Sequence, residues 1–264
     1  KAEIVEGMKV GGTAILNADD ELVAAMASLS KGKVVTFGLV NEADMKATDI
    51  VVSGFNGSRF EMETPIGSAA VKFPLNGKHN VLNALAAAAV GASFGMSTTD
   101  IASALSSVAA PPQRGEIVNF KQGFTVINDS YNSNPDALLS MVETLVSGGT
   151  EAKRKIVVAG EMLELGQHGT EIHHETGRKV AASGVDVLIG VRGLAAEMVG
   201  GAAEGGLSDV RFAADSDAAG EMLAAMVQPG DAILIKGSRG VRTEKVLEKL
   251  LEKFELADNN AAER

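Results

Sequence analysis

In the second half of the chain, apolar runs of strand length alternate with amphipathic stretches of helical length. The apolar runs cover residues 124–127, 155–159, 185–189, 210–213 and 232–235. Between and after them, residues 136–146, 173–182, 195–199, 218–226 and 243–254 repeat apolar positions with the helical period. Repeated strand–helix units predict a mostly parallel sheet covered by helices, of the Rossmann-like class.

The first part of the chain has a different pattern, in which short strands follow one another more closely. Strands are predicted at residues 13–17, 34–37, 50–55, 59–64 and 69–73, with turns at Asn56-Gly57 and Pro65-Ile66-Gly67. Helices are predicted at residues 1–9, 79–93 and 101–108, and the last of these follows a cap at Thr98 or Thr99. Another helix is predicted to run from a cap at Asp19 or Asp20 through residue 26.

The change of pattern falls at Pro111-Pro112. Two consecutive prolines cannot continue a helix, and they stiffen the backbone that joins the two segments. We therefore expect two α/β domains, at residues 1–112 and 113–264.

The composition narrows the class of protein without changing this architecture. The chain has 264 residues, a net charge of −10 and no cysteine. An acidic protein is not expected to bind nucleic acid, which requires clustered Lys and Arg. The longest apolar runs are too short to span a membrane and the chain starts without a signal-peptide pattern, so we expect a cytoplasmic protein.

Two asparagines lie near the start of the predicted helix at 79–93. Asn80 and Asn83 are three residues apart, so their side chains share one face of the helix. Asparagine at a helix start is most often a cap, and we favour that interpretation on this segment alone. The alternative is that the two amides read the edge of a nucleotide base.

The most informative polar stretch is Asn128-Asp129-Ser130-Tyr131-Asn132-Ser133-Asn134-Pro135, which follows an apolar strand directly. In open α/β sheets the ligand lies beyond the carboxyl ends of the strands. The stretch contains the chain's one tyrosine, so we favour a binding site over a loop of simple turns.

Two further loops follow predicted strands. Residues 160–166 (GEMLELG) place Glu161 and Glu164 at a strand end, where they could bind an amine or metal or be ordinary solvated residues. Residues 236–240 (KGSRG) combine Lys236, Ser238 and Arg239 with two glycines at a predicted helix start, which favours an anion site. His168, His173 and His174 lack the spacing of a zinc site.

Two nucleotide motifs are absent from the sequence. The phosphate loop G-x-x-x-x-G-K-[ST] does not occur, and neither does the G-x-G-x-x-G turn of nicotinamide-dependent enzymes. The chain taken alone is therefore compatible with a non-catalytic ligand-binding module of Rossmann-like fold.

Seven segments in order resemble the Mur ligase family. They are KAEI, TAILNADD, GKHNVLNALAAAA, PPQRGEI, INDSYNSNPDAL, VVAGEMLELG and IKGSRGVRTEKVLE. The resemblance implies that residues 1–112 are the remainder of a central ATPase-type α/β domain whose phosphate loop is missing. It implies that residues 113–264 are the Rossmann-like C-terminal ligase domain. The N-terminal domains of the same protein are then expected to lie outside this chain.

The resemblance also implies a reaction and its participants. ATP with Mg²⁺ phosphorylates the carboxylate of a UDP-N-acetylmuramoyl-tripeptide, and D-alanyl-D-alanine attacks the acyl phosphate in peptidoglycan synthesis. Asn80 and Asn83 would lie at the adenine, Arg114 at the γ-phosphate and Asp129 at the ribose. The dipeptide pocket would include further side chains: Tyr131, Asn132, Ser133, Glu161, Glu164, Lys236, Ser238 and Arg239.

Three more residues match family positions. Lys1 corresponds to a lysine that takes up carbon dioxide and, as a carbamate, ligates magnesium. His79 and His173 also match, and neither the residues nor the resemblance assigns them a role. From the residues alone, we favour an ordinary solvated arginine at Arg114 over a phosphate ligand.

Overall fold

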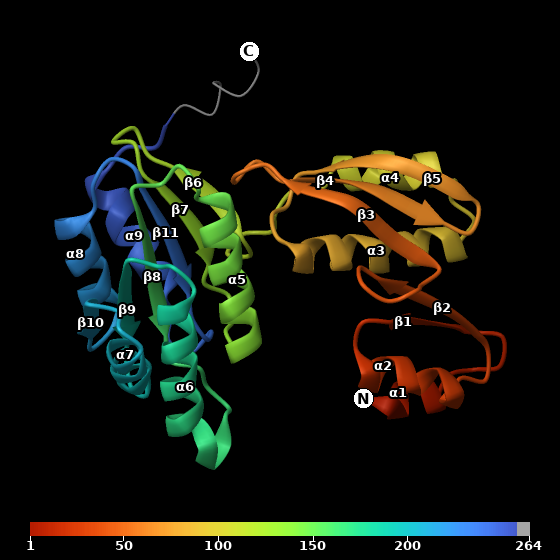
Figure 1. The fold of residues 1–264 in the computed structure, drawn as a ribbon, viewed down its shortest axis with the longest axis horizontal. Helices are drawn as coiled ribbons and strands as arrows, with labels where there is room; N and C mark the ends of the chain where they lie inside the picture. The colour runs from red at the N-terminus through yellow and green to blue at the C-terminus, as the bar shows by residue number, and fades with distance from the viewer. Residues whose placement is uncertain (258–264) are drawn as a thin grey trace. The chain divides into compact units, whose positions relative to one another are not determined.

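The protein is described by a computed structural model, which defines residues 1–257. The chain divides into two compact units, Lys1–Ala109 and Ala110–Arg264. Each unit contains its own sheet and its own helices (Figure 1).

The sheet of the first unit has the order β1-β2-β3-β4-β5. Its first three strands pair in parallel, and β3, β4 and β5 form an antiparallel meander. The strands are β1 Thr13–Asn17, β2 Lys33–Gly38, β3 Met45–Val52, β4 Ser58–Thr64 and β5 Gly67–Phe73. The helices are α1 Ala2–Glu6, α2 Glu21–Ala25, the 3₁₀ helix η1 Met26–Leu29, α3 Lys78–Ser93 and α4 Thr98–Ser106.

The meander is buried on one face, as the alternation in its sequence requires. In β4 the side chains of Ser58, Phe60 and Met62 are buried, whereas those of the intervening residues are wholly or partly exposed. The apolar face packs against α3, whose buried residues include Val81 and Leu85. Period-two burial in the strands and a single apolar stripe on the helix therefore produce a two-layered core.

Two sequence predictions for this unit are corrected by the structure. The cap of α4 is Ser97, whose hydroxyl accepts from Asp100 N at 3.2 Å, rather than Thr98 or Thr99. The cap of α3 is Gly77, with φ of +89°, so Asn80 and Asn83 lie inside the helix and do not cap it. A glycine takes this backbone conformation at no steric cost, and it provides no side chain to cap the helix.

The sheet of the second unit has the order β10-β9-β8-β11-β7-β6. All neighbours are parallel except β6, an antiparallel edge strand that the sequence did not predict. The strands are β6 Glu116–Asn119, β7 Thr125–Asp129, β8 Arg154–Gly160, β9 Val187–Val191, β10 Asp209–Ala213 and β11 Asp231–Lys236. The helices are α5 Pro135–Gly148, the 3₁₀ helix η2 Gly166–His168, α6 Gly169–Ala182, α7 Ala195–Glu204, α8 Ser216–Met226 and α9 Glu244–Lys253.

Helices cover both faces of this sheet, with α5, α6 and α7 on one face and α8 and α9 on the other (Figure 1). The central strands are consequently buried on both sides, and every residue of β9 and β11 is buried. This explains why their sequences are continuous apolar runs without alternation.

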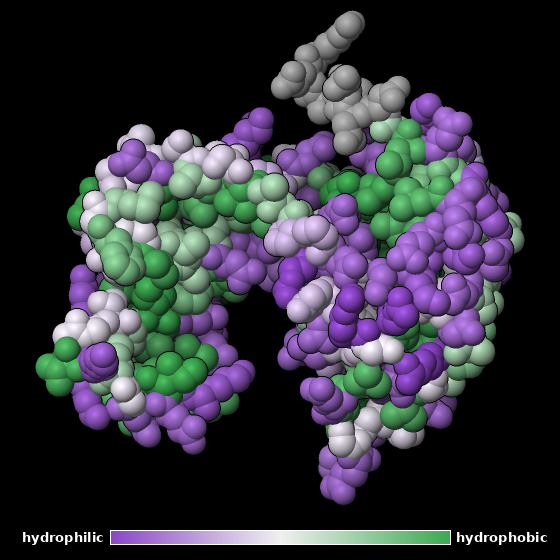
Figure 2. Space-filling model, turned by 180° about the vertical axis from the view of Figure 1, so that it is seen from behind, coloured by the Kyte–Doolittle hydropathy of each residue, from purple (hydrophilic) through white to green (hydrophobic). Residues whose placement is uncertain are grey.

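The two units differ in the apolar surface that they expose. In Figure 2 the first unit, on the left, shows more apolar and weakly polar surface, and the second unit is mostly hydrophilic. The exposed large apolar side chains of the first unit include Ile4, Val10, Leu22, Val40 and Phe94. Among the described residues, no helix is both long and apolar enough to cross a membrane.

Helices α6 and α7 approach each other through glycines. A methyl group at Gly177 would lie 1.9 Å from Met198 O, and one at Gly201 would lie 1.9 Å from His174 O. Gly200, the neighbour of Gly201 in α7, has no atom within 4 Å of the same position. Backbone therefore packs on backbone at Gly201, whereas Gly200 points into open space.

We predict that Gly201→Ala lowers the free energy of unfolding by about 3 kcal/mol, because the clashing atom belongs to backbone that cannot rotate away. Gly200→Ala is the matched control and should be neutral or raise stability by about 0.5–1 kcal/mol. Urea unfolding followed by circular dichroism measures both changes. Equal stability of the two variants would show that α6 and α7 are not packed this closely.

Candidate functional site

The connections around β11 create the crevice in which a ligand of this fold class binds. The chain leaves β7 and β8 toward α5 and α6 on one face of the sheet, and it leaves β11 toward α9 on the other. Neighbouring parallel strands whose connections diverge in this way form a topological switch point. The carboxyl end of β11 is therefore flanked on both sides by such a point.

The register of these strands brings the predicted residues of three loops to one edge. Lys236 is paired with Asp129 of β7 and with Ala159 of β8. Lys236 Nζ donates to Asp129 Oδ2 at 2.5 Å and to Asn132 O at 2.9 Å, and the lysine is 4% exposed. A buried lysine is stable here because a carboxylate and a carbonyl satisfy its ammonium group.

A single hydroxyl connects the loops that follow β7, β8 and β11. Ser238 Oγ accepts from Leu163 N at 3.0 Å and donates to Ser133 O at 3.4 Å. Ser133 is itself buried, and its Oγ has no hydrogen-bond partner among the described residues. A buried hydroxyl without a partner is costly unless a ligand or water completes it, so Ser133 marks this edge as a binding surface.

His173 of α6 holds the loop after β8 in place through a hydrogen bond. It is fully buried, its Nε2 accepts from Met162 N at 2.9 Å, and its Nδ1 lies 2.6 Å from Gly169 O. An acceptor at Nε2 places the proton on Nδ1, which donates to the carbonyl, so the imidazole is neutral. The structure thus gives His173 a positioning role that the sequence could not assign.

The two glutamates of this loop are in different surroundings. Glu161 Oε1 accepts from Leu194 N at 3.1 Å, next to the start of α7. A methyl group at Gly193 would lie 2.4 Å from the same carboxylate, so a larger residue would require the Glu161 side chain to move. Glu164 is exposed and has a φ of +66°, with no hydrogen bond or ion pair to the described part of the chain.

The segment that enters the second unit is docked on the same edge. Tyr131 N donates to Gln113 O at 3.2 Å, and the Arg114 guanidinium carbon lies 4.1 Å from the centre of the Tyr131 ring. Arg239 donates to Gln113 Oε1 at 3.1 Å and to Glu244 Oε1 at 3.2 Å. A cation over an aromatic face is held weakly and remains accessible, so Arg114 is placed without being buried.

Strained backbone is concentrated at this edge. Four non-glycine residues of the second unit have positive φ, namely Gln113, Glu164, Arg192 and Arg242, and all lie in loops at the carboxyl ends of the parallel strands or in the entering segment. Such conformations persist only where the surroundings enforce them, and they are frequent at binding sites.

Arg192, Gln113 and Glu244 are site residues that the sequence interpretation missed. Arg192 directly follows β9, but the apolar run was ended at residue 189, two residues before the strand ends at Val191. The signal was a basic residue followed by glycine at a strand end, as in Lys236-Gly237. Gln113 and Glu244 carry no comparable signal, because their contacts join segments that are far apart in sequence.

In the first unit, the predicted nucleotide residues form a small amide pair. Asn80 Nδ2 donates to Asn76 O at 2.8 Å, and Asn83 Nδ2 lies 3.4 Å from Asn80 Oδ1. Asn83 is exposed, so its carbonyl oxygen can accept a hydrogen bond from a ligand. Lys1 is also exposed, at the N-cap of α1.

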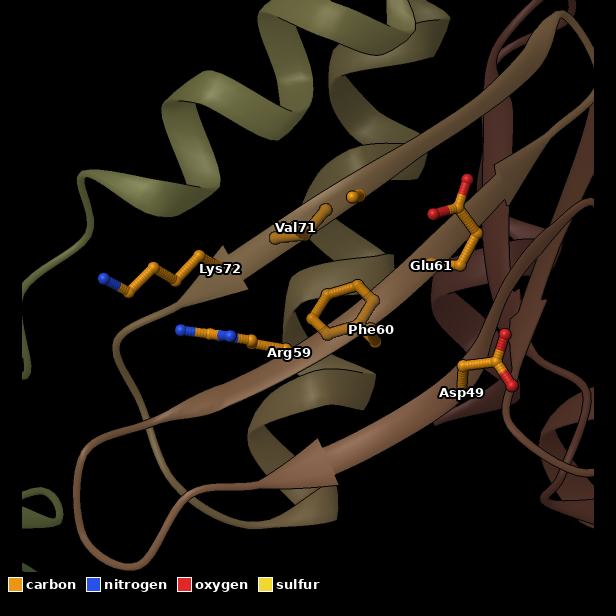
Figure 3. Close-up of a pocket in the computed structure, with 7 residues that line it drawn as sticks. Asp49, Arg59, Phe60, Glu61, Val71 and Lys72 are labelled. Carbon is orange, nitrogen blue, oxygen red and sulfur yellow. The ribbon is translucent and has the colours of Figure 1, made fainter.

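A shallow pocket of about 310 Å³ lies on the strands of the first unit and has a different character. Arg59 and Lys72 lie at one end and Asp49 and Glu61 at the other (Figure 3). None of the site residues predicted from the sequence lines this pocket. Its charged side chains are of both signs, which does not favour the binding of a nucleotide or a dipeptide.

Comparison with known proteins agrees with the division of motifs along the chain. Residues 1–91 match the Mur ligase middle domain, and residues 113–239 match the Mur ligase, glutamate ligase domain. The chain is 34% identical over 272 residues to the UDP-N-acetylmuramoyl-tripeptide–D-alanyl-D-alanine ligase of Mycobacterium bovis. That alignment covers 95% of this chain and 53% of the relative, so the chain spans about half the length of the curated relatives it matches.

Solved structures give the same result. The crystal structure of MurF from Acinetobacter baumannii superimposes with a TM-score of 0.85 at 28% identity, covering 96% of this chain and 54% of that one. MurF from Thermotoga maritima, solved in complex with ADP, has a TM-score of 0.81 at 24% identity, covers 95% and 56% respectively, and shares the fold. Two family models along the chain, a relative at 34% identity and the shared fold together establish that this chain belongs to the Mur ligase family.

Proposed function

We propose that the full protein is a cytoplasmic, ATP-dependent amide-bond ligase that adds D-alanyl-D-alanine to UDP-N-acetylmuramoyl-tripeptide in peptidoglycan synthesis. The proposal rests on the loops at the carboxyl ends of the strands in the second unit. There Ser238 connects three loops around a buried Lys236–Asp129 pair. The similarity to ligases of this specificity supports the choice of substrates.

In this proposal, residues 1–112 belong to the central ATP-binding domain and residues 113–264 form the ligase domain. The exposed amide of Asn83, supported by the half-buried Asn80, binds the adenine, and Asp129 contacts the ribose with the carboxylate oxygen that Lys236 does not occupy. Arg114 stabilises the charge of the γ-phosphoryl group during transfer, since a guanidinium matches the geometry of phosphate oxygens.

The dipeptide then binds at the carboxyl ends of the strands, against the loops that follow β7, β8 and β11. Tyr131, Asn132 and Ser133 contribute from β7, and Ser238 and Arg239 from β11, with Glu161 and Glu164 on the side of β8. Lys236 acts by holding Asn132 and Asp129 in place, because two of its three N–H donors bind them. The amine of the dipeptide attacks the acyl phosphate, and phosphate leaves.

Magnesium neutralises phosphate charge in such reactions. Among the described residues, no three His, Asp or Glu side chains gather into a metal site. As a carbamate, the exposed Lys1 would supply magnesium with a carboxylate-like oxygen in place of an ammonium group.

The proposal predicts dipeptide-dependent ATP hydrolysis by the full-length protein. With ATP, magnesium and UDP-N-acetylmuramoyl-tripeptide, phosphate release should require D-alanyl-D-alanine and yield the amide product, detected by mass spectrometry. The 264-residue chain alone should be inactive, because no phosphate loop is present to cradle the β- and γ-phosphates. Full-length protein that binds the dipeptide but forms no product would instead support a non-catalytic module.

Arg114→Ala in the full-length protein should lower kcat about 100-fold, the effect expected when one charged donor to a transition state is lost. Arg114→Lys should recover only part of this loss, because a point charge lacks the forked geometry. The control is Arg59→Ala, an exposed arginine on β4. Turnover that is the same in the Arg114→Ala and Arg59→Ala proteins would exclude Arg114 from the reaction.

His173→Ala should raise the KM for the dipeptide roughly 10-fold or more, since an unpaired Met162 N–H releases the loop that Ser238 binds. The KM for ATP should stay nearly constant. His173→Gln can still accept from Met162 N and should recover part of the affinity. His174→Ala is the control on the same helix, because His174 points to Glu204, 3.3 Å away. A loss of stability without a change in the dipeptide KM would show that His173 only supports the fold.

A further inference from the structure

The side chain of Arg192 spans the crevice between β8 and β11. Arg192 follows β9, yet its NH1 donates to Gly240 O, in the loop after β11, at 2.8 Å. To do so it passes the end of β8, which lies between these two strands in the sheet. The guanidinium is thus fixed at the edge where the loops of the candidate site meet.

The charge of Arg192 is less completely compensated than that of Lys236 or Arg239. Lys236 has Asp129 at 2.5 Å, and Arg239 has Glu244 at 3.2 Å. The nearest carboxylate to Arg192 is that of Glu161, 3.8 Å from Nε, and its other oxygen already accepts from Leu194 N.

The remaining donors of Arg192 are accessible. Its side chain is 49% exposed, and its NH2 group makes no hydrogen bond within the part of the chain that the structure describes. The hydrogen bond to Gly240 O orients the guanidinium plane without neutralising it, because a carbonyl carries no net charge. A pinned, partly exposed and incompletely neutralised guanidinium is suited to a carboxylate ligand.

The guanidinium of Arg192 lies close to the loop that carries Ser238. Its NH1 is 2.8 Å from Gly240 O, two residues after Ser238, and Ser238 in turn contacts the loops after β7 and β8. A ligand held by these loops can therefore present a carboxylate to the NH2 group of Arg192.

We propose that Arg192 binds the terminal carboxylate of the incoming dipeptide. This inference rests on the proposed function and adds to it a substrate-binding residue after β9. Glu161, beside Arg192, limits the movement of the guanidinium and excludes a second anion from the same position.

The test compares two substrates in the full-length protein: D-alanyl-D-alanine and its C-terminal amide, D-alanyl-D-alaninamide, which has the same shape without the carboxylate charge. The variants are Arg192→Ala and Arg192→Gln. Glutamine retains a donor near Gly240 O and removes the charge, so it keeps the test decisive if the alanine variant does not fold. The control is Arg178→Ala on α6, whose guanidinium is 52% exposed and pairs with Glu204 at 2.7 Å.

We expect kcat/KM for the free dipeptide to fall on the order of 100-fold in both Arg192 variants, mainly through KM. The amide should be a poor substrate for the unmodified protein and change less than about 3-fold in the variants, because the interaction lost is already absent. Calorimetric titration with the free dipeptide should show the same loss of affinity.

Equal losses for the two substrates, or no loss for the free dipeptide, would overturn the role of Arg192. Those results are distinct from failure of the proposed function, in which the unmodified protein would form no product from the dipeptide at all.

Discussion

The parallel insertion of β11 between β7 and β8 is the constraint on which the candidate site depends. It pairs Lys236 with Asp129 and brings Ser238 within hydrogen-bonding distance of loops that lie 75 and 105 residues earlier in the chain. Because the connections after β11 and after its neighbours leave on opposite faces, the loops diverge and leave a crevice between them. A shift of β11 by one residue would turn Lys236 to the other face of the sheet and abolish this arrangement.

The site combines rigid support with accessible charge. His173 and Lys236 are buried and hydrogen-bonded, and they hold backbone in place. Arg114 and Arg192 are exposed; a tyrosine ring orients the first, and a carbonyl with a carboxylate 3.8 Å away orients the second. Buried polar groups require full satisfaction, whereas exposed guanidinium groups can exchange solvent for a ligand. This division explains why some polar motifs act beneath the binding surface and others act on it.

Much of the fold could be predicted from the sequence. The strand–helix alternation after Pro112 led to the parallel sheet, and the continuous apolar runs indicated strands buried on both faces. The edge strand β6 was missed, because its residues Glu116–Asn119 are partly exposed and too few to show a periodic pattern. The caps at Gly77 and Ser97 were assigned to the wrong residues, because glycine and several neighbouring hydroxyl residues are all acceptable caps and only backbone geometry distinguishes them.

By itself, the sequence determined the fold class, the change of pattern at the two prolines and the identity of the polar loops at strand ends, because periodicity and local turn chemistry are properties of neighbouring residues. Tertiary structure decided which of those loops meet, that His173 is neutral and buried beneath one of them, and that Arg192 spans the crevice to Gly240. The order of strands in a sheet is set by packing between segments that are distant in sequence. The local sequence therefore gives no sign that a side chain after one strand contacts the loop after a strand two places away in the sheet.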